Sequence, residues 1–323
     1  MSPQPEAVAP HAQIVIPIEN QALAQGRDAY ASLYENLAAK LEPLGPAGAV
    51  SALPALDFAT DEYIAFTARY RLSSKVHGLA DENAFHDGMA RFSRLSAKLP
   101  FKPNFVRFSA QSGDDEALFE TADAAYLWLN SKMPVARSVF DQLALHEAAQ
   151  ALTVAGLTEA AIREMVQPAL LKVLAGEMDF QGFLSAMKNV EGFGVPGFLS
   201  PEAHREIVYR TNVMSAYNHG HVEYGASLEN SQLFPGAEIY VVVDERTSDI
   251  CRPLARMRVT REMVLNGPYC PPFHYNCRTT IVWIIADYWQ MNNKVLMPGY
   301  WEAAPEKNRI LPGFGYFTSA LAA

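Results

Sequence analysis

The pattern of apolar and polar residues divides the chain into a helical part and a shorter part with strands. Apolar residues recur at near-helical spacing from Tyr63 to Leu72 and throughout the Ala- and Leu-rich stretch 136–190. Further along, β-branched and aromatic residues gather in the runs 238–244 and 278–285, a composition typical of strands. Between these two runs a short helix is expected to begin at Thr260. The sequence therefore predicts an α+β fold, with a mainly helical N-terminal region followed by a small α/β domain.

The first sixty residues alternate between irregular and helical patterns. Residues 1–20 are rich in Pro and Ala and predict an irregular arm, in which the apolar stretch 14–18 would add as an edge strand. A helix is expected over 21–41, and the Pro- and Gly-rich residues 43–57 predict a linker or long loop. Thr60 then has the features of a helix cap.

The stretch 136–190 is expected to contain more than one helix. Gly156 would end the first helix, Thr158 would cap the next, and Pro168 would kink or split it. After a glycine-rich hinge, Ser200-Pro201-Glu202 combines a hydroxyl cap, a proline at the first helical position and an acid near the positive helix end. A long helix is therefore expected from this point to about residue 228.

These patterns divide the chain into four segments. The small α/β domain would pack one long helix on a short antiparallel sheet, beside a cluster of loops that carry Cys and His. The segments are 1–57 (arm, helix and linker), 58–197 (helical region), 198–290 (α/β domain) and 291–323 (irregular tail).

The chain is acidic, with a formal net charge of -9 and an isoelectric point of about 5.4. This charge excludes a generally basic surface for nucleic acid, although it allows a local patch. The longest apolar runs, 14–18 and 281–286, are too short to cross a bilayer. Because no secretory signal is visible either, we expect a reducing cytoplasm and no membrane partner.

Five arginines form a local positive cluster in this acidic chain. Such a cluster can contact DNA or an acidic protein surface. The favoured alternative is a solvated face that Glu245, Asp249 and Glu262 balance. The five residues are Arg246, Arg252, Arg256, Arg258 and Arg261.

All three cysteines of the chain lie close together, and a histidine stands among them. They are Cys251, Cys270 and Cys277, with His274 between the last two. Three thiols and one imidazole form a full set of tetrahedral zinc ligands, and thiolates on two loops can converge without a large core. Two alternatives stay open: a structural zinc site, and metal-free buried thiols that pack as small apolar residues. A catalytic zinc is disfavoured.

Asp244, Thr247 and Arg278 form a second group. Asp244 ends a predicted strand, so its carboxylate can cap the turn through Thr247. It can also pair with Arg278, whose planar guanidinium suits a carboxylate, and such a pair would lock two loops together. An active-site acid is the weaker interpretation, because turn-capping aspartates are far commoner than catalytic ones.

The long helix carries further polar residues. Arg210 is expected to hold this helix to the following sheet through a buried pair, and His219 and His221 are expected at the surface. His-x-Glu together with cysteines is similar to the zinc deaminases, but these need Pro-Cys-x-x-Cys, and Cys270 and Cys277 are too far apart for that pattern.

Three motifs follow one another in the C-terminal half of the chain. They are Arg210-Thr-Asn, Asp244-Glu-Arg-Thr247-Ser-Asp-Ile-Cys251-Arg-Pro-Leu254, and Pro271-Pro-Phe-His274-Tyr-Asn-Cys277-Arg278. Their order resembles the C-terminal domain of the phage Mu F-like minor head proteins. That family has Arg-Thr-Glu, then Asp-x-x-Thr-Cys-x-x-Cys-x-x-Leu, then Pro-Pro-x-His-Pro-x-Cys-Arg-Cys. With an upstream stretch that resembles the family's helical lead-in, the likeness covers residues 120–286.

This chain departs from the family pattern at several positions. Ser248 and Thr279 stand where the family has cysteines, and Asn212 stands where it has glutamate. Cys270 is an additional cysteine, which would restore one metal ligand. Tyr275 follows the histidine in place of proline.

The resemblance implies a minor structural protein of a tailed-phage or prophage head, present in the virion and in the host cytoplasm during assembly. Proteins of this kind act with the portal and scaffold in procapsid assembly and affect DNA packaging or delivery. Phosphate loops, Ser-His-Asp arrangements and dinucleotide motifs are all missing from the sequence, so we expect no enzyme. The alternative is a zinc-dependent hydrolase, with Asp244 or Glu223 as general base, or an effector whose phage-like domain serves delivery.

Overall fold

The computed structural model describes residues 10–96, 117–190, 201–227, 230, 232–266 and 269–289. The elements are α1 (Pro10–Leu41), η1 (Glu42–Leu44), α2 (Gly45–Ala52), η2 (Leu53–Ala55), α3 (Asp61–Ser96), α4 (Ala122–Lys132), α5 (Arg137–Leu174), α6 (Phe180–Lys188), α7 (Pro201–Ala226), β1 (Gly236–Tyr240), η3 (Arg252–Leu254), β2 (Arg258–Thr260), α8 (Arg261–Asn266), β3 (Thr280–Ile284) and α9 (Ala286–Trp289).

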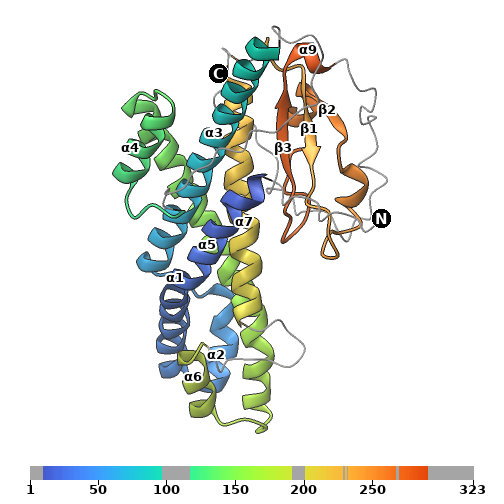
Figure 1. Cartoon of the computed structure of the whole chain (residues 1–323). Helices are drawn as coiled ribbons and strands as arrows, with labels where there is room; N and C mark the ends of the chain where they lie inside the picture. Colours follow the sequence, from blue (N-terminus) through green and yellow to red (C-terminus); the bar gives the residue numbers. More distant parts are fainter. Residues whose placement is uncertain are drawn as a thin grey trace.

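The long helices α1, α3, α5 and α7 form an elongated body, and the sheet packs beside one half of it (Figure 1). The three strands are antiparallel in the order β2-β1-β3, so β1 is central. Its register places Ala237 opposite Val259 of β2 and Trp283 of β3. The expected α+β fold is therefore confirmed, including the long helix α7 against a short antiparallel sheet.

Two apolar cores hold these parts together. In the helical core, Tyr209 of α7 makes edge-to-face contacts with Tyr30 and Tyr70, whose ring centroids lie 5.7 Å and 5.1 Å away. The second core lies under the sheet and includes Val222 of α7 and Trp283 of β3. Because α7 contributes to both cores, it joins the helical body to the sheet.

Two glycines allow α3 and α7 to cross closely. A Cβ atom on Gly78 would lie 2.2 Å from the carbonyl oxygen of Tyr217, and one on Gly220 would lie 2.4 Å from that of Lys75. Both distances are far inside van der Waals contact, so only glycine fits at this crossing. The crossing brings the polar residues of the two helices within reach of each other and of β3.

The N-terminal expectations need correction. Residues 14–18 belong to α1 and do not form an edge strand, because Val15, Ile18 and Ala22 repeat at helical spacing and are all buried in the helical core. The expected linker 43–57 instead contains η1, α2 and η2. Leu53 is buried there against the body, which explains why the segment is ordered.

The helix breaks expected at Gly156 and Pro168 are absent. Helix α5 runs through Gly156 and Pro168 without a break. Thr158 lies inside α5 and therefore does not cap a helix. Its hydroxyl oxygen instead lies 2.9 Å from that of Tyr63. The short strand β2 was not expected from the sequence at all.

Several expected helix starts are confirmed. The Thr60 hydroxyl accepts a hydrogen bond from the Tyr63 N–H at the start of α3, and the Thr260 hydroxyl accepts one from the Met263 N–H at the start of α8. Helix α7 begins at Pro201. The expected hinge before it and the tail 291–323 lie outside the described residues.

Candidate metal centre and loop joint

Two loops meet beside the sheet, one after β1 and one before β3. Asp244 lies on the first and Arg278 on the second. The two guanidinium nitrogens Nη1 and Nη2 of Arg278 donate to Oδ2 and Oδ1 of Asp244 at 2.7 Å and 2.6 Å. The expected bidentate pair is therefore present, and it links residues 34 positions apart. This pair defines the loop joint.

The Asp244 carboxyl has its pKa lowered to about 2, because Arg278 hydrogen bonds to it and outweighs the effect of partial burial. Its backbone N–H donates to the Thr247 hydroxyl at 2.7 Å, and that hydroxyl donates to the Val242 carbonyl at 2.7 Å. The expected turn through Thr247 is thus confirmed. A carboxylate held in this way is a structural anchor and is poorly suited to accept a proton near neutral pH.

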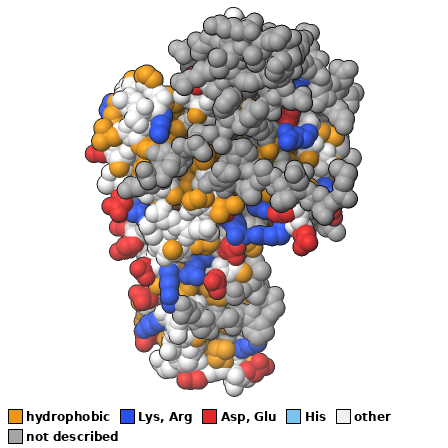
Figure 2. Space-filling model, in the orientation of Figure 1, with side chains coloured by type: hydrophobic (Ala, Val, Ile, Leu, Met, Phe, Trp, Pro, Cys, Tyr) orange, Lys and Arg blue, Asp and Glu red, His pale blue; other side chains and the backbone are white. Residues whose placement is uncertain are grey.

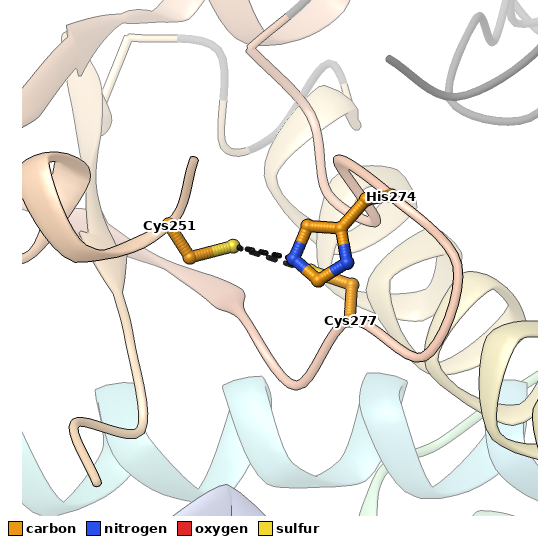
Figure 3. A group of neighbouring side chains, drawn as sticks. All are labelled: Cys251, His274 and Cys277. Atoms are coloured by element: carbon orange, nitrogen blue, oxygen red, sulfur yellow. Dashed lines mark hydrogen bonds between the residues drawn. The ribbon is translucent and has the colours of Figure 1, made fainter. Parts of the chain in front are cut away.

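Three potential metal ligands converge behind the joint: Cys251, His274 and Cys277, whose ligand atoms all lie within 4.8 Å of one another (Figure 3). The two sulfurs are 3.7 Å apart, and the Cys251 sulfur is 3.1 Å from His274 Nε2. A tetrahedral zinc would separate the sulfurs by about 3.8 Å and each sulfur from the nitrogen by about 3.6 Å. The sulfur pair already has this spacing, and the imidazole needs only a small outward shift. These three side chains could therefore hold a metal ion.

The imidazole of His274 is oriented by its other nitrogen. Nδ1 lies 2.7 Å from the Tyr275 carbonyl oxygen, which can only accept, so Nδ1 carries the proton. In the neutral ring this leaves the Nε2 lone pair directed at the thiols. Metal-binding histidines usually have such a backbone partner, which fixes the ring and its tautomer.

A hydroxyl lies beside the three ligands. Ser248 Oγ is 2.8 Å from His274 Nε2 and accepts a hydrogen bond from the Cys251 N–H at 3.2 Å. Ser248 stands where the family pattern suggested by the sequence has a cysteine. A hydroxyl therefore lies within hydrogen-bond distance of one of the three ligands, at the sequence position where the family pattern has a thiol.

Cys270 does not belong to this group, so its expected role as a metal ligand is wrong. Its sulfur contacts the neighbouring Pro271 carbonyl oxygen at 3.6 Å. Burial raises its thiol pKa to about 12. Cys270 instead packs in the core under the sheet as a small apolar residue, the metal-free alternative considered for all three cysteines.

The pKa values of the two clustered thiols, Cys251 and Cys277, are shifted in opposite directions. Burial opposes ionisation of Cys277, but hydrogen bonds from Cys251 and from His274 in its protonated form outweigh it and hold the Cys277 pKa well below its usual value. The pKa of Cys251 is raised, first by its hydrogen bond with Cys277 and then by burial. One thiolate beside one thiol is the charge state that the metal-free pair favours.

The arginine cluster is largely used inside the domain. Arg258 is buried and donates to the Trp289 carbonyl at 2.5 Å, so its expected contact with a partner is wrong. Arg261 donates to the Gly225 and Ala226 carbonyls at the end of α7.

The other three arginines lie at the surface. Arg252 donates to the carbonyls of Asp244 and Thr247, both at 3.2 Å, and so supports the loop joint. Arg256 pairs with Glu238 at 3.0 Å, an acid other than the three that were expected to balance the cluster. Arg246 is exposed beside Asp244 and is the member of the cluster best placed to meet a partner.

The polar residues of α7 also differ from expectation. Arg210 pairs with Glu19 of α1 at 3.4 Å and with Glu206, so it holds α7 to the body and not to the sheet. His219 and His221 were expected at the surface and are buried. The close crossing at Gly220 explains this burial, because α3 covers this face of α7.

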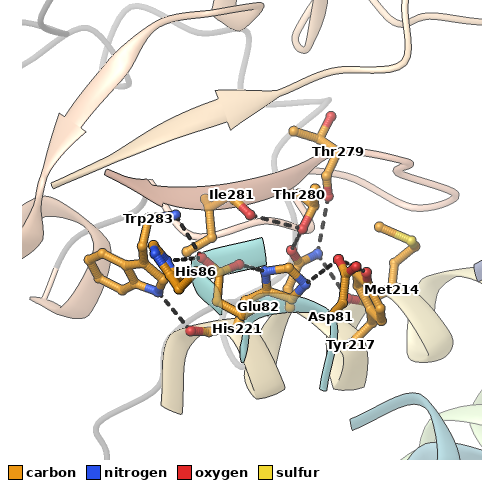
Figure 4. Close-up of polar contacts among 11 residues, drawn as sticks. Asp81, Glu82, His86, Met214, Tyr217, His221, Thr279, Thr280, Ile281 and Trp283 are labelled. Atoms are coloured by element: carbon orange, nitrogen blue, oxygen red, sulfur yellow. Dashed lines mark hydrogen bonds and ion pairs between the residues drawn. The ribbon is translucent and has the colours of Figure 1, made fainter. Parts of the chain in front are cut away.

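Sequence reasoning missed a buried network of hydrogen bonds and ion pairs around Glu82, which links α3, α7 and β3 (Figure 4). We call it the Glu82 network. The Glu82 carboxylate lies 2.5 Å from His221 Nδ1 and 3.0 Å from His86 Nε2, and it accepts the Trp283 backbone N–H of β3 at 3.0 Å. Burial would raise the Glu82 pKa, but His221 and His86 lower it to about 2. The spacing of Glu82 and His86 signals a helix pair, whereas nothing in the sequence signals the contact with β3.

A second buried network lies deeper in the helical body. Lys75 of α3 pairs with Glu147 of α5 at 3.0 Å and with Glu223 of α7 at 2.6 Å. Arg71 pairs with Glu147 at 3.2 Å. Burial would lower the Lys75 pKa, but the two carboxylates raise it above its usual value. Glu223 is thus engaged in an ion pair within the body.

The visible surface shows acidic side chains in a row along the left edge of the helical body, with basic side chains scattered between (Figure 2). Among the described helices, none combines the length and apolar character needed to cross a membrane. No protein-family model, curated protein or solved structure matches this chain. Function is therefore inferred from the motif residues and their geometry.

Proposed function

We propose that this protein is a minor structural protein of a tailed-phage or prophage head, which associates with the portal during procapsid assembly and DNA packaging or delivery. The observation that carries the proposal is the loop joint, where the motif residues Asp244 and Arg278 meet through a bidentate pair. Two of the three motifs that resemble the Mu F-like proteins thus meet beside Cys251, His274 and Cys277. The order of the motifs in the sequence and the contact between their residues together support the resemblance better than the order alone.

The proposed role of the loop joint is mechanical. A partner that docks on two loops loses less conformational entropy when those loops are already fixed. The Asp244–Arg278 pair, the Thr247 turn and the Arg252 contacts fix them here. We therefore expect the portal, or another head or scaffold protein, to dock on this end of the α/β domain, with Arg246 at the contact.

We further propose that Cys251, His274 and Cys277 hold a structural zinc ion. Zinc would supply a cross-link between the two loops. Ser248, or a water molecule that it holds, would occupy the fourth position. DNA contact, if it occurs, would be confined to the exposed arginines, because the chain as a whole is acidic.

A zinc-dependent hydrolase receives less support from the same geometry. A catalytic site needs a general base near a metal-bound water. Of the two candidate bases, Asp244 is paired with Arg278 and Glu223 with Lys75. Neither carboxylate is free to take a proton, so we propose a structural protein and no enzyme.

Co-expression with the portal protein encoded by the same genome tests the proposal. We expect the two proteins to co-purify, and we expect Asp244→Ala to weaken the complex at least tenfold, because it releases Arg278 and the Thr247 turn. Glu245→Ala, at an exposed neighbouring position, is the matched control and should bind like the wild type. A wild-type chain that never co-elutes with the portal would contradict the proposed function.

A further inference from the structure

Helix α5 has an inverted distribution of charge. Between the exposed Asp141 and Glu164, its acidic residues are Glu147 and Glu159, and both are buried. Glu147 points inward to Lys75 and Arg71, as described above, and Glu159 pairs with Arg163 at 2.9 Å. The outward face of this part of α5 is thereby left without an acidic side chain.

Large apolar side chains occupy that outward face. Leu145 is 71% exposed and Leu152 is 57% exposed, and both lie on the same side of the helix as the exposed Ala149 and Gly156. Together these four residues form the α5 seam. A leucine pair this exposed on a rigid helix is costly in water, at about 25 cal/mol per Å² of apolar surface. Such a stripe indicates a contact that a partner covers.

The α5 seam has the spacing of a coiled-coil contact. Its members follow at intervals of four, three and four residues, which place them at alternating positions of a heptad. Leucines occupy one type of position and small residues the other. In an antiparallel pair of helices the two types face each other.

The seam is therefore complementary to itself when it is inverted. In an antiparallel pair centred between Ala149 and Leu152, Leu145 of one copy faces Gly156 of the other, and Ala149 faces Leu152. Each large side chain thus meets a small one, and the same four contacts occur in both directions. A two-fold symmetric contact requires this kind of self-complementarity.

Charge permits a second copy to approach at this face, although it opposes association elsewhere. Each chain carries a net charge of -9, so two copies repel over most of their surfaces. An uncharged face is where two equally acidic molecules can approach with least repulsion. A basic partner, by contrast, would be attracted to acidic surface outside the seam.

From these observations we propose that two copies of this chain associate through the α5 seam, with their α5 helices antiparallel. The inference is independent of the portal-binding function proposed above. Because the seam covers only about three helical turns, the interface is small, and we expect a reversible dimer with a dissociation constant in the micromolar range or weaker.

Sedimentation velocity of the full chain over a range of concentrations tests the dimer. We expect a monomer–dimer equilibrium in the wild type, and we expect Leu152→Glu to weaken it at least tenfold, because each dimer would then bury two like charges. Leu171→Glu is the matched control. Leu171 is 50% exposed on the same helix but outside the seam, so this variant should dimerise like the wild type.

Cysteine cross-linking tests the orientation. The native cysteines are buried, so introduced ones dominate the reaction with oxidised glutathione. A mixture of Ala149→Cys and Leu152→Cys chains should form mainly the mixed disulfide, whereas parallel helices would form mainly the two homodimers.

Three results would overturn the proposal. The first is a wild-type chain that stays monomeric at high micromolar concentration, which would leave the seam to a different partner or to another segment of this chain. The second is equal loss of dimer in Leu152→Glu and Leu171→Glu. The third is a parallel cross-linking pattern. Circular dichroism of each variant shows whether it is folded, and Leu152→Ala provides a milder second test at the same position.

Discussion

At the scale of single residues, small differences in geometry decide what the Cys/His cluster can do. Cys251 and Cys277 already have the sulfur spacing of a zinc site, and His274 is held in the tautomer that leaves Nε2 available. Ser248 Oγ lies 2.8 Å from the same nitrogen. The proposed zinc site would therefore have an oxygen where a four-ligand Cys₃His site has a third sulfur.

This geometry predicts that Ser248→Cys strengthens metal binding. A third thiolate at this position would complete a Cys₃His set, so we expect zinc affinity to rise at least tenfold. Competition with a colorimetric chelator measures the affinity, and Ser248→Ala is the control that should not gain. Unchanged affinity in Ser248→Cys would mean that the hydroxyl does not lie at the metal position.

We expect the buried His204 of α7 to lower the free energy of unfolding as the solution becomes acidic. Burial lowers its pKa to about 4, and its buried Nε2 has no hydrogen-bond partner among the described residues. The folded state therefore resists protonation, and stability is lost as the pH falls from about 6.5 towards 4. From pH 7 to pH 5 this amounts to about 2 kcal/mol.

Urea unfolding at pH 7 and pH 5 measures that step. The variant His204→Phe has no group to protonate at this position, so it should lose less stability than the wild type between the two pH values. Equal losses in both proteins would show that His204 does not contribute. His146, which is exposed, supplies the control variant His146→Phe, which should keep the full pH dependence.

At the scale of elements, the crossing of α3 and α7 fixes where the sheet can dock. Gly220→Ala would place a methyl group 2.4 Å from the Lys75 carbonyl oxygen. We expect a loss of about 1–3 kcal/mol in the free energy of unfolding, because both helices must separate to admit it.

The matched control for this crossing is Gly182→Ala in α6. A Cβ at Gly182 meets only the Asp179 side chain, at 3.9 Å. Alanine should be neutral there or stabilise by up to about 1 kcal/mol, because it favours the helix. If thermal or urea unfolding gave both alanine variants the same stability, the close crossing would not control the packing of α3 on α7.

Sequence patterns identified elements best where local signals act alone. The caps at Thr60 and Thr260 and the pair of Asp244 with Arg278 could be predicted, since each depends on the chemistry of one or two side chains. The breaks expected at Gly156 and Pro168 failed because tertiary packing of α5 outweighs local propensity.

The site was predictable only in part, for a related reason. Clustering in the sequence suggested four metal ligands, and three of them lie together in the structure. Cys270 was misassigned, because a buried thiol and a ligating thiol look the same in sequence. His221 was misplaced at the surface, because its burial depends on Gly78 and Gly220, whose joint effect appears only when α3 and α7 cross.

At the scale of the whole molecule, α7 and the Glu82 network join the sheet and the helical body into one structural unit. Glu82 of α3 accepts a hydrogen bond from the Trp283 backbone N–H of β3 and lies between His221 and His86. Glu82→Ala would leave these groups buried without their partner. We expect a loss of about 3 kcal/mol or more.

Hydrogen exchange locates this loss. We expect β3 and α3 to lose protection together in Glu82→Ala, because the sheet and the body depend on the same carboxylate. The exposed acid Glu245 gives the control variant Glu245→Ala, which should change stability by less than about 0.5 kcal/mol. Loss of protection confined to β3 would show instead that the sheet is an independent unit.

In our proposal, a metal ion locks the motif loops into a rigid docking surface. Native mass spectrometry of the purified full chain measures whether that ion is bound. We predict one zinc ion per chain in the wild type and in Cys270→Ala, and none in Cys277→Ser, whose unfolding midpoint should also fall. A wild-type chain with the metal-free mass after purification in zinc-containing buffer, or a Cys277→Ser chain that keeps its zinc, would contradict the claim.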